Sequence, residues 1–141
     1  MIISTKGRYG IRVMIDLAQH GEDGYIPLKT IAERQGISEK YLESILKVLV
    51  QEKLLEGLRG KGGGYRLTRK PPVYTLGEIL RLTEGSLAPV ACVEEHGNEC
   101  PNRSVCPTLP VWQKLDALIN EFLDGITLAD LMTPQNTEED S

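Results

Sequence analysis

Apolar residues recur at helical spacing through most of the first fifty positions. Between residues 7 and 20 they predict an amphipathic helix that Ser4 or Thr5 can cap. A second, short helix is expected to follow Pro27 and to end at Gly36, where glycine commonly terminates a helix. The apolar face of the first helix comprises Tyr9, Val13, Met14, Leu17 and Ala18.

A third helix is predicted to begin only two residues after the second one ends. Ser38 is a suitable N-cap, and Ile37 and Leu42 are spaced to form a hydrophobic staple. Two short helices joined by a tight turn that contains glycine are typical of a helix-turn-helix. The apolar positions of this third helix are Leu42, Ile45, Leu46, Leu49 and Val50.

The pattern changes from helix to short strands after Lys53. Residues 54–59 and 64–68 predict two strands, joined by the glycine-rich segment 60–63, where positive φ angles are permitted. A hairpin directly after a recognition helix is the wing of a winged fold. The predicted fold class is therefore mainly α with a small β-hairpin, a winged helix-turn-helix.

The second half of the chain predicts two further helices and a final turn. Thr75 and Glu78 form a capping box for a helix over residues 76–84, and Gly85 follows its end. A later, longer helix carries an apolar stripe that either packs on the chain's own core or pairs with a second chain. Thr127 can cap a last short turn. The stripe comprises Trp112, Leu115, Leu118, Ile119, Phe122 and Leu123.

These elements divide the 141 residues into five parts, with no internal repeat. The expected parts are a winged helix-turn-helix DNA-binding domain over residues 1–75, a connecting helix and linker over 76–91, a cysteine-containing loop over 92–106, a long C-terminal dimerisation helix region over 107–132 and a disordered acidic tail over 133–141.

Charge is distributed unevenly between the two halves. The whole chain has a net charge of −4, yet residues 1–75 hold 13 Lys and Arg against 8 acidic residues, and residues 76–141 hold 3 against 12. A basic half beside an acidic one indicates a face that binds a polyanion. Charge alone is equally compatible with two solvated faces, so the indication depends on the helix-turn-helix and the wing.

In a helix-turn-helix, the start of the second helix enters the major groove of double-stranded DNA. Ser38 and Tyr41 can then hydrogen-bond phosphates, and Lys40 and Lys47 can neutralise them. Glu43 can accept from a cytosine amino group but repels phosphate, so it favours discrimination over affinity. The candidate DNA-binding residues are Ser38, Lys40, Tyr41, Glu43, Ser44 and Lys47 on the helix and Arg59, Gly60 and Lys61 on the wing.

The size of the unit predicts how it binds. One such module buries only about 600 to 1,000 Å² against DNA, so specific binding normally needs two modules. Pairing of the apolar C-terminal helix with a second copy would give a homodimer on a roughly palindromic operator.

Three cysteines lie within fifteen residues, in the pattern Cys92-x7-Cys100-x5-Cys106. A cytosolic chain keeps thiols reduced, and three thiols crowded in a polar segment favour a soft metal, an iron–sulphur cluster or reaction with oxidants. The spacing does not choose among these. His96 could supply a fourth ligand, and Glu94, Glu95 and Glu99 are alternative oxygen ligands.

Several classes of protein are not expected. There is no phosphate-cradling loop and no Ser/His/Asp set, and the only histidines are His20 and His96, so an enzyme is not predicted. The N-terminus has no long apolar run of the kind found in signal peptides, and no stretch approaches a membrane span. We therefore expect a cytoplasmic protein without membrane contact.

The motifs together resemble the IscR/NsrR/CymR family of winged-helix repressors, and in particular its IscR-like iron–sulphur cluster regulators. The resemblance covers about residues 1–132. It is carried by residues 4–9 (STKGRY), 31–38 (IAERQGIS), 41–43 (YLE), 59–65 (RGKGGGY), the three cysteines and residues 126–131 (ITLADL).

The resemblance implies a homodimer that holds one [2Fe–2S] cluster per subunit through Cys92, Cys100 and Cys106, with cluster occupancy changing which promoters are bound. Control of cluster-assembly genes, and cluster-assembly proteins as cluster donors, follow from the same likeness. It also implies base or phosphate contacts from residues of the recognition helix, a specificity switch at Glu43 and a minor-groove contact at Arg59. The recognition-helix contacts are Ser38, Lys40, Tyr41 and Ser44.

The chain departs from the family pattern at the fourth ligand. IscR-like members commonly carry a histidine three residues after the third cysteine, where this chain has Leu109, and the first cysteine gap here is two residues longer. NsrR-like members use an acidic residue from the partner subunit at a position that is Arg8 in this chain. Neither ligand transfers, so the fourth ligand and the signal stay open.

Three hypotheses about the function follow from the sequence. The first is a regulator that senses a cluster, and the second is a regulator without a cluster that senses thiol oxidation or a partner protein, as CymR-like members do. The third is a small iron–sulphur electron carrier, which would leave the helix-turn-helix and the wing without a role.

Overall fold

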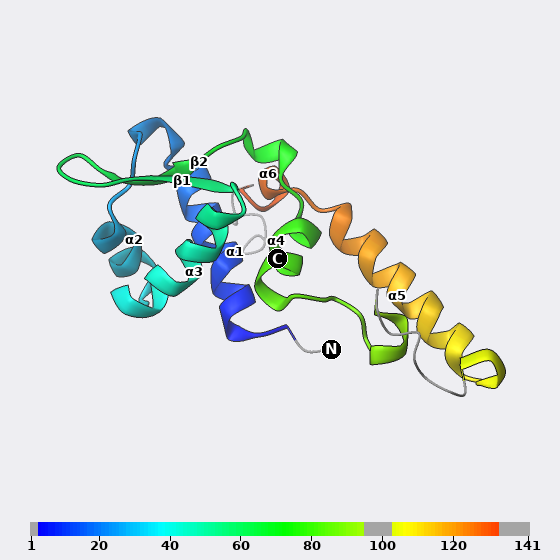
Figure 1. Cartoon of the computed structure of the whole chain (residues 1–141). Coiled ribbons are helices and arrows are strands. Elements are labelled where there is room, and N and C mark those ends of the chain that lie inside the picture. The colour runs from blue at the N-terminus through cyan, green and yellow to red at the C-terminus, as the bar shows by residue number, and fades with distance from the viewer. Residues whose placement is uncertain (1–2, 95–102, 133–141) are drawn as a thin grey trace, which may run out of the picture.

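The computed structural model describes residues 3–94 and 103–132 (Figure 1). Within these ranges the chain is mostly helical with one two-stranded hairpin, which confirms the expected fold class. The expected acidic tail, residues 133–141, lies outside the described residues. The elements are α1 (Thr5–Gln19), α2 (Leu28–Gln35), α3 (Glu39–Gln51), β1 (Leu55–Leu58), β2 (Gly64–Leu67), α4 (Leu76–Glu84), α5 (Leu109–Asp124) and α6 (Leu128–Leu131), with short 3₁₀ turns at Gly21–Asp23, Pro71–Val73, Ala91–Val93 and Arg103–Val105.

The ends of the first three helices follow the local sequence signals. Ser4 caps α1, because its hydroxyl accepts a hydrogen bond from the Gly7 amide at 3.0 Å. Gly36 ends α2 in the left-handed conformation, at φ 67°. Ser38 caps α3 by accepting from the Tyr41 amide at 3.1 Å. The predicted boundaries of the helix-turn-helix are therefore confirmed to within about two residues.

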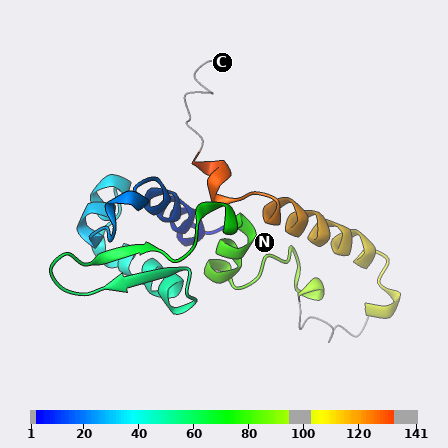
Figure 2. The same ribbon diagram turned by 90° about the horizontal axis from the view of Figure 1, so that it is seen from above.

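The core lies between α1, α3, α4 and the base of the hairpin, as Figures 1 and 2 show together. It is almost wholly aliphatic, and full burial of each large side chain contributes about 1.5 to 3 kcal/mol. The predicted apolar faces of α1 and α3 supply six of its twelve fully buried large side chains. The fully buried large side chains are Met14, Leu17, Ile31, Leu42, Ile45, Leu46, Leu49, Leu54, Leu55, Tyr74, Ile79 and Leu128.

Asp16 is a charged residue buried on α1, with only 3% of its surface exposed. Its carboxylate accepts two hydrogen bonds from the Arg34 guanidinium, at 2.7 and 3.0 Å, and one from the Gln35 amide at 2.9 Å. Burial raises the pKa of Asp16, but the hydrogen bonds from Arg34 and Gln35 outweigh it and hold the pKa below its ordinary value. The ionised carboxylate therefore joins α1 to the end of α2.

The hairpin is attached to the body through a close backbone contact. β1 and β2 pair antiparallel with Leu58 opposite Gly64, and Tyr65 exchanges two hydrogen bonds of 2.9 Å with Ile26. Gly64 has a φ of 144°, and a side chain there would collide with the Ile26 carbonyl. Only glycine allows this approach.

Tyr74 holds the base of the hairpin from within the core. Its hydroxyl donates to the Leu54 carbonyl at 2.7 Å and accepts from the amides of Thr68 and Arg69 at 2.9 and 3.0 Å. Tyr74 immediately precedes the N-cap of α4, so this one hydroxyl connects the hairpin to that helix.

The start of α4 differs in part from expectation. Thr75 caps α4 by accepting from the Glu78 amide, but the Glu78 carboxylate binds the Arg69 guanidinium at 2.9 Å. Half of the predicted capping box is therefore replaced by an ion pair.

The α5 helix extends away from the other elements (Figures 1 and 2). No helix in the described part of the chain is long and apolar enough to cross a membrane.

Replacing Asp16 with Asn is expected to lower the free energy of unfolding at pH 7 by about 2 kcal/mol, because charge-assisted hydrogen bonds are lost. Since the pKa of Asp16 is depressed in the folded state, its contribution is present above about pH 4 and fades as the pH falls further. Urea denaturation at pH 7 and at pH 3 should show the difference between the two proteins shrinking. Glu33→Gln, at an exposed position on α2, is the control and should change little; an equal loss in both variants would contradict the assignment.

Replacing Gly64 with Ala is expected to cost about 3 kcal/mol, because backbone rather than a flexible side chain occupies the space that the methyl group needs. Gly62→Ala is the matched control, since Gly62 also has a positive φ of 80° but no neighbouring atom within 4 Å, and it should cost about 1 kcal/mol. Thermal unfolding of both variants makes the comparison. Equal losses would show that strain in φ, and not the contact with Ile26, governs Gly64.

Candidate nucleic-acid interface

The recognition helix α3 and the hairpin face each other across an open groove of about 1170 Å³. Six of the nine DNA-binding residues expected from the sequence line it, and three do not: Ser38, Tyr41 and Lys61. The six are Lys40, Glu43, Ser44, Lys47, Arg59 and Gly60. Local sequence alone placed these residues on two separate elements, and the fold brings them onto one surface.

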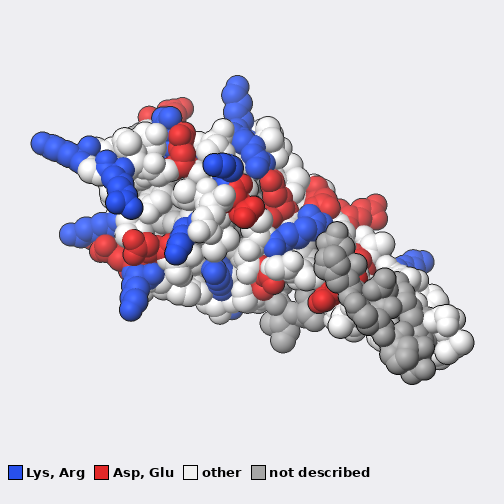
Figure 3. All heavy atoms as spheres, viewed as in Figure 1, with Lys and Arg blue, Asp and Glu red and all other residues white. Residues whose placement is uncertain are grey.

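Basic side chains project around this groove. Lys40 and Lys47 are exposed on α3, and Arg59 and Lys61 are exposed at the turn of the hairpin. Figure 3 shows lysines and arginines projecting at the end of the molecule formed by the hairpin, α2 and α3, with acidic side chains between them. Such a surface attracts a phosphate backbone and gives binding that weakens as salt rises.

Glu43 is exposed and lines the same groove as Lys40 and Lys47. These positions are three and four residues from it on the helix, so the carboxylate lies between two cations. A carboxylate here can accept from the amino group of a cytosine, and it opposes phosphate when no such group is present. The geometry suits a residue that selects sequence.

The other polar residues of the recognition helix are partly engaged within the protein. The Ser38 hydroxyl oxygen caps the helix, which leaves its proton available for donation. The Ser44 hydroxyl donates to the Tyr41 carbonyl at 2.6 Å, which leaves its oxygen as an acceptor. Tyr41 is half-buried, with its ring edge-to-face against Tyr9 of α1 at a centroid distance of 6.0 Å. The start of α3 is thus supported by α1.

Nine other residues that line the groove were not predicted from the sequence, among them Pro27, Leu28 and Tyr65. Pro27 and Leu28 begin α2, and Tyr65 is on β2 beside them through its pairing with Ile26. Their apolar atoms suit contact with a thymine methyl group or with sugar. The signal was present in the helix start at Pro27, but the approach of the hairpin to it depends on tertiary structure.

The cysteine segment is described only in part. Cys92 lies in the turn Ala91–Val93 and Cys106 follows the turn Arg103–Val105; both are half-buried thiols. Hydrogen bonding to the Thr108 hydroxyl, with its oxygen 3.3 Å from the sulphur, lowers the pKa of Cys106, and the Thr108 and Leu109 amides add to this. Cys100 lies outside the described residues, as do His96, Glu95 and Glu99.

The described donors fit thiolate ligation but do not complete a site. The two described cysteines are thiols, and hydrogen bonds from Thr108 and Leu109 lower the pKa of Cys106 towards the thiolate form that binds metal. Among the described residues no group of three or more His, Cys, Asp or Glu side chains could hold a metal ion. Leu109 offers no ligand atom, and the Arg8 guanidinium donates to Thr5 at 3.1 Å. Of the remaining candidates, Glu94 is exposed.

The α5 helix is apolar on two sides. Trp112, Ile119 and Leu123 are half-buried on one side, in agreement with packing on the chain's own elements. A second stripe is exposed, with Leu118 at 53% and Phe122 at 66% exposure. Its members recur at helical spacing and are Val111, Leu115, Leu118 and Phe122. One face of the helix therefore packs on the chain's own elements, and pairing of the other face with a second chain stays a prediction.

Comparison with known proteins gives consistent matches over nearly the whole chain. The IscR transcriptional regulator of Aliivibrio salmonicida is 39% identical over 140 residues, which span 99% of this chain and 82% of that protein. The IscR protein of Yersinia pestis is 37% identical over 139 residues, 99% of this chain and 84% of that protein.

Solved structures agree with these relatives. The IscR structure from T. potens is 42% identical with a TM-score of 0.75, covering 100% of this chain and 91% of that one. The structure of CymR, the global cysteine regulator of B. subtilis, is 38% identical with a TM-score of 0.76, covering 94% of this chain and 97% of that one. The Rrf2 family, described as iron-dependent transcriptional regulators, matches residues 3–134. The chain therefore belongs to the Rrf2 family and is an IscR-like, DNA-binding transcriptional regulator rather than an enzyme.

Proposed function

We propose that the protein is a homodimeric repressor that reads a roughly palindromic operator and senses iron–sulphur cluster status through a cysteine-ligated [2Fe–2S] cluster. The observation that carries the proposal is the open groove between α3 and the hairpin, lined by Lys40, Lys47 and Arg59 from both sides. Cluster-assembly genes are the expected targets, as the resemblance of the sequence to IscR-like regulators implies.

The groove residues have distinct roles in this proposal. Ser38, Lys40, Tyr41 and Lys47 contact phosphates and position α3 in the major groove, while Glu43 and Ser44 contact base edges. Arg59 and Lys61, with Gly60 removing steric bulk between them, follow a narrow minor groove. The hairpin can hold this position because its backbone is attached to Ile26.

In this proposal, a second copy of the chain completes the DNA-binding unit. The exposed stripe on α5 is continuous, and large exposed apolar side chains of this kind are characteristic of interfaces. Pairing through this stripe makes a two-fold dimer, and two-fold symmetry matches a palindromic site.

The cysteine segment supplies the sensor. Cys92, Cys100 and Cys106 would hold the cluster, and Cys106 is prepared for ligation because Thr108 favours its thiolate. When bound, a [2Fe–2S] cluster supplies a redox-sensitive cross-link between segments of the chain. Cluster-assembly proteins would be its donors, which places the protein in the cytoplasm.

A second candidate function keeps the DNA binding without the cluster. The likeness to B. subtilis CymR and the lowered pKa of Cys106 both favour a regulator that responds to thiol oxidation or to a partner protein. An electron carrier has no comparable support, because it gives the groove no role.

Removing a cation from the groove should reduce the salt dependence of DNA binding. Lys40→Ala and Lys47→Ala are each expected to make the slope of log affinity against log salt shallower by about 0.9, since one phosphate contact is lost. Fluorescence anisotropy would use a DNA duplex selected from a random library by the wild-type protein. Lys114→Ala on α5 is the charge-matched control and should leave the slope unchanged; unchanged slopes in the groove variants would remove these lysines from the interface.

Protein purified or reconstituted without oxygen is expected to be brown and to contain about two iron and two sulphide ions per chain. A variant with all three cysteines replaced by serine should be colourless and should no longer change its operator choice with oxygen. A colourless wild-type protein would overturn cluster sensing. If that protein still responded to oxygen through the three cysteines, the thiol-oxidation function would replace it.

A further inference from the structure

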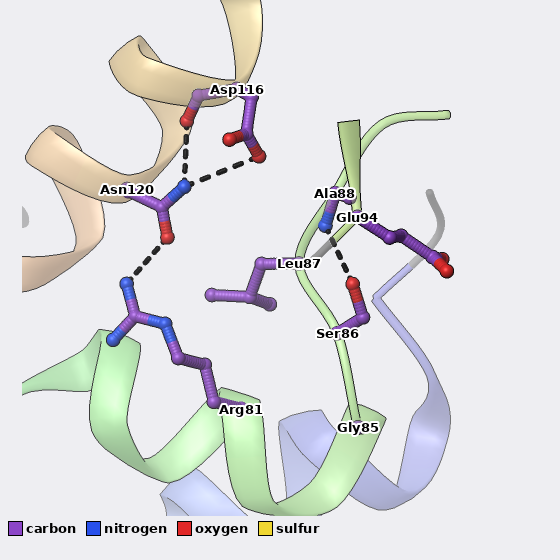
Figure 4. Close-up of a pocket in the computed structure, with 8 residues that line it drawn as sticks. All are labelled: Arg81, Gly85, Ser86, Leu87, Ala88, Glu94, Asp116 and Asn120. Atoms are coloured by element: carbon purple, nitrogen blue, oxygen red, sulfur yellow. Dashed lines mark hydrogen bonds between the residues drawn. The ribbon is translucent and has the colours of Figure 1, made fainter. Parts of the chain in front are cut away.

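The long helix α5 is joined to α4 by a compact group of polar side chains. The Arg81 guanidinium of α4 binds both oxygens of the Asp124 carboxylate, at 2.8 and 2.9 Å, and donates to the Asn120 side-chain oxygen. Asn120 and Asp124 are one helical turn apart on α5 (Figure 4 shows Asn120 beside Arg81). We call these three residues the Arg81 joint.

The surroundings are shaped for this joint. Gly77 is buried within α4, and a side chain there would collide with the Asp124 carboxylate. A side chain at Gly77 would therefore require the Asp124 carboxylate to move from its position against α4. The Asn120 amide in turn donates to the Asp116 carbonyl at 2.8 Å, which orients its oxygen towards Arg81.

Two backbone hydrogen bonds near this group fix the position of the chain after α5 rather than the direction of the helix axis. The Leu76 amide donates to the Ile126 carbonyl at 2.8 Å, and the Leu128 amide donates to the Tyr74 carbonyl at 3.0 Å. Both bonds lie beyond Gly125, outside the helix. The Arg81 joint contacts the last turn of the helix itself, so it affects the direction of the α5 axis directly.

Packing beside the joint is incomplete. A cavity of about 370 Å³ adjoins it, with Leu87 and Glu94 on one wall and Asp116 on another (Figure 4). The turn Ala91–Val93, which carries Cys92, touches α5 further along. The Arg81 joint therefore acts together with the half-buried apolar side chains Ile119 and Leu123 in positioning α5.

A small rotation at the joint has a large effect at the far end of α5. A helix of 16 residues is about 24 Å long, so a rotation of about 10° moves its far end by about 4 Å. One base pair advances the DNA axis by about 3.4 Å. A displacement of this size is comparable to the rise of one base pair along the DNA axis.

We propose that Arg81 is a positioning residue that sets the separation of the two recognition helices, and thereby the spacer length that the dimer accepts between half-sites. The proposal rests on the proposed function, because it requires a dimer that pairs through α5. Arg81 does not contact DNA in this proposal; it acts through Asp124 and Asn120 on the direction of the helix that pairs the two copies.

The test compares operator spacing, which a general loss of stability would not alter. The probe is a DNA duplex selected from a random library by the wild-type protein, together with versions that have one base pair added or removed at the centre of symmetry, and a single half-site. The variants are Arg81→Met, the conservative Arg81→Lys, and Arg69→Met. Arg69 makes an equivalent two-point pair with Glu78 near the start of α4, away from α5, and serves as the matched control.

The wild-type protein and Arg69→Met are expected to bind the altered spacings at least about tenfold more weakly than the selected one, because the DNA must twist or bend to fit. Arg81→Met should narrow this difference to within about threefold while half-site affinity is kept, and Arg81→Lys should lie between. If Arg81→Met does not fold by circular dichroism, Asp124→Asn replaces it with the same expectation. An unchanged spacing preference in the Arg81 variants would overturn the role of Arg81 alone, whereas a wild-type protein without any spacing preference would overturn the proposed dimeric reading as well.

Discussion

The close approach of α4 to both α1 and α5 is the constraint on which the rest of the structure depends. Gly7 and Gly10 of α1 face the end of α4, and a side chain at Gly7 would collide with the Glu84 carboxylate. That carboxylate accepts hydrogen bonds from the Ser4 amide and hydroxyl, at 3.0 and 2.7 Å, at the positive end of the α1 dipole. On its other side, α4 holds α5 through Arg81. One nine-residue helix therefore connects the helix-turn-helix and hairpin to α5.

This arrangement also explains how α3 is held. Helix α1 is fixed at its start by Glu84 and further along by the ion pair between Asp16 and Arg34, and between these points Tyr9 supports Tyr41 at the start of α3. Because Tyr41 is one of the proposed DNA contacts, a movement of α1 would act on the start of α3. The linker to Cys92 begins directly after Glu84, so the cysteine segment is eight residues from this contact.

Much of the fold could be predicted because its signals are local. Caps such as Ser38, terminators such as Gly36 and the spacing of apolar residues act within one or two helical turns. The roles of Asp16 and Tyr74 could not be predicted, because each depends on partners brought together from distant elements. The ion pair between Glu78 and Arg69 is a similar case. The local sequence predicts that Glu78 caps its own helix, but in the folded chain its carboxylate binds Arg69, which follows the hairpin.

The residues of the candidate site could likewise be predicted only in part. Residues on α3 and the hairpin were identifiable because the helix-turn-helix and wing follow one another in sequence, whereas Pro27 and Leu28 join the groove only through the backbone contact of Tyr65 with Ile26. The stripe on α5 could be recognised, but its division into a packed and an exposed face could not, since all its members are apolar.

Hydroxyl-radical footprinting of the wild-type protein on its selected DNA duplex would test the central claim most directly, that two copies of α3 and of the hairpin read one operator. The expected result is a pattern with two-fold symmetry, with protected sugars on one face of the duplex in two regions separated by about one or two helical turns. A single protected region without symmetry, at protein concentrations that saturate the duplex, would contradict it.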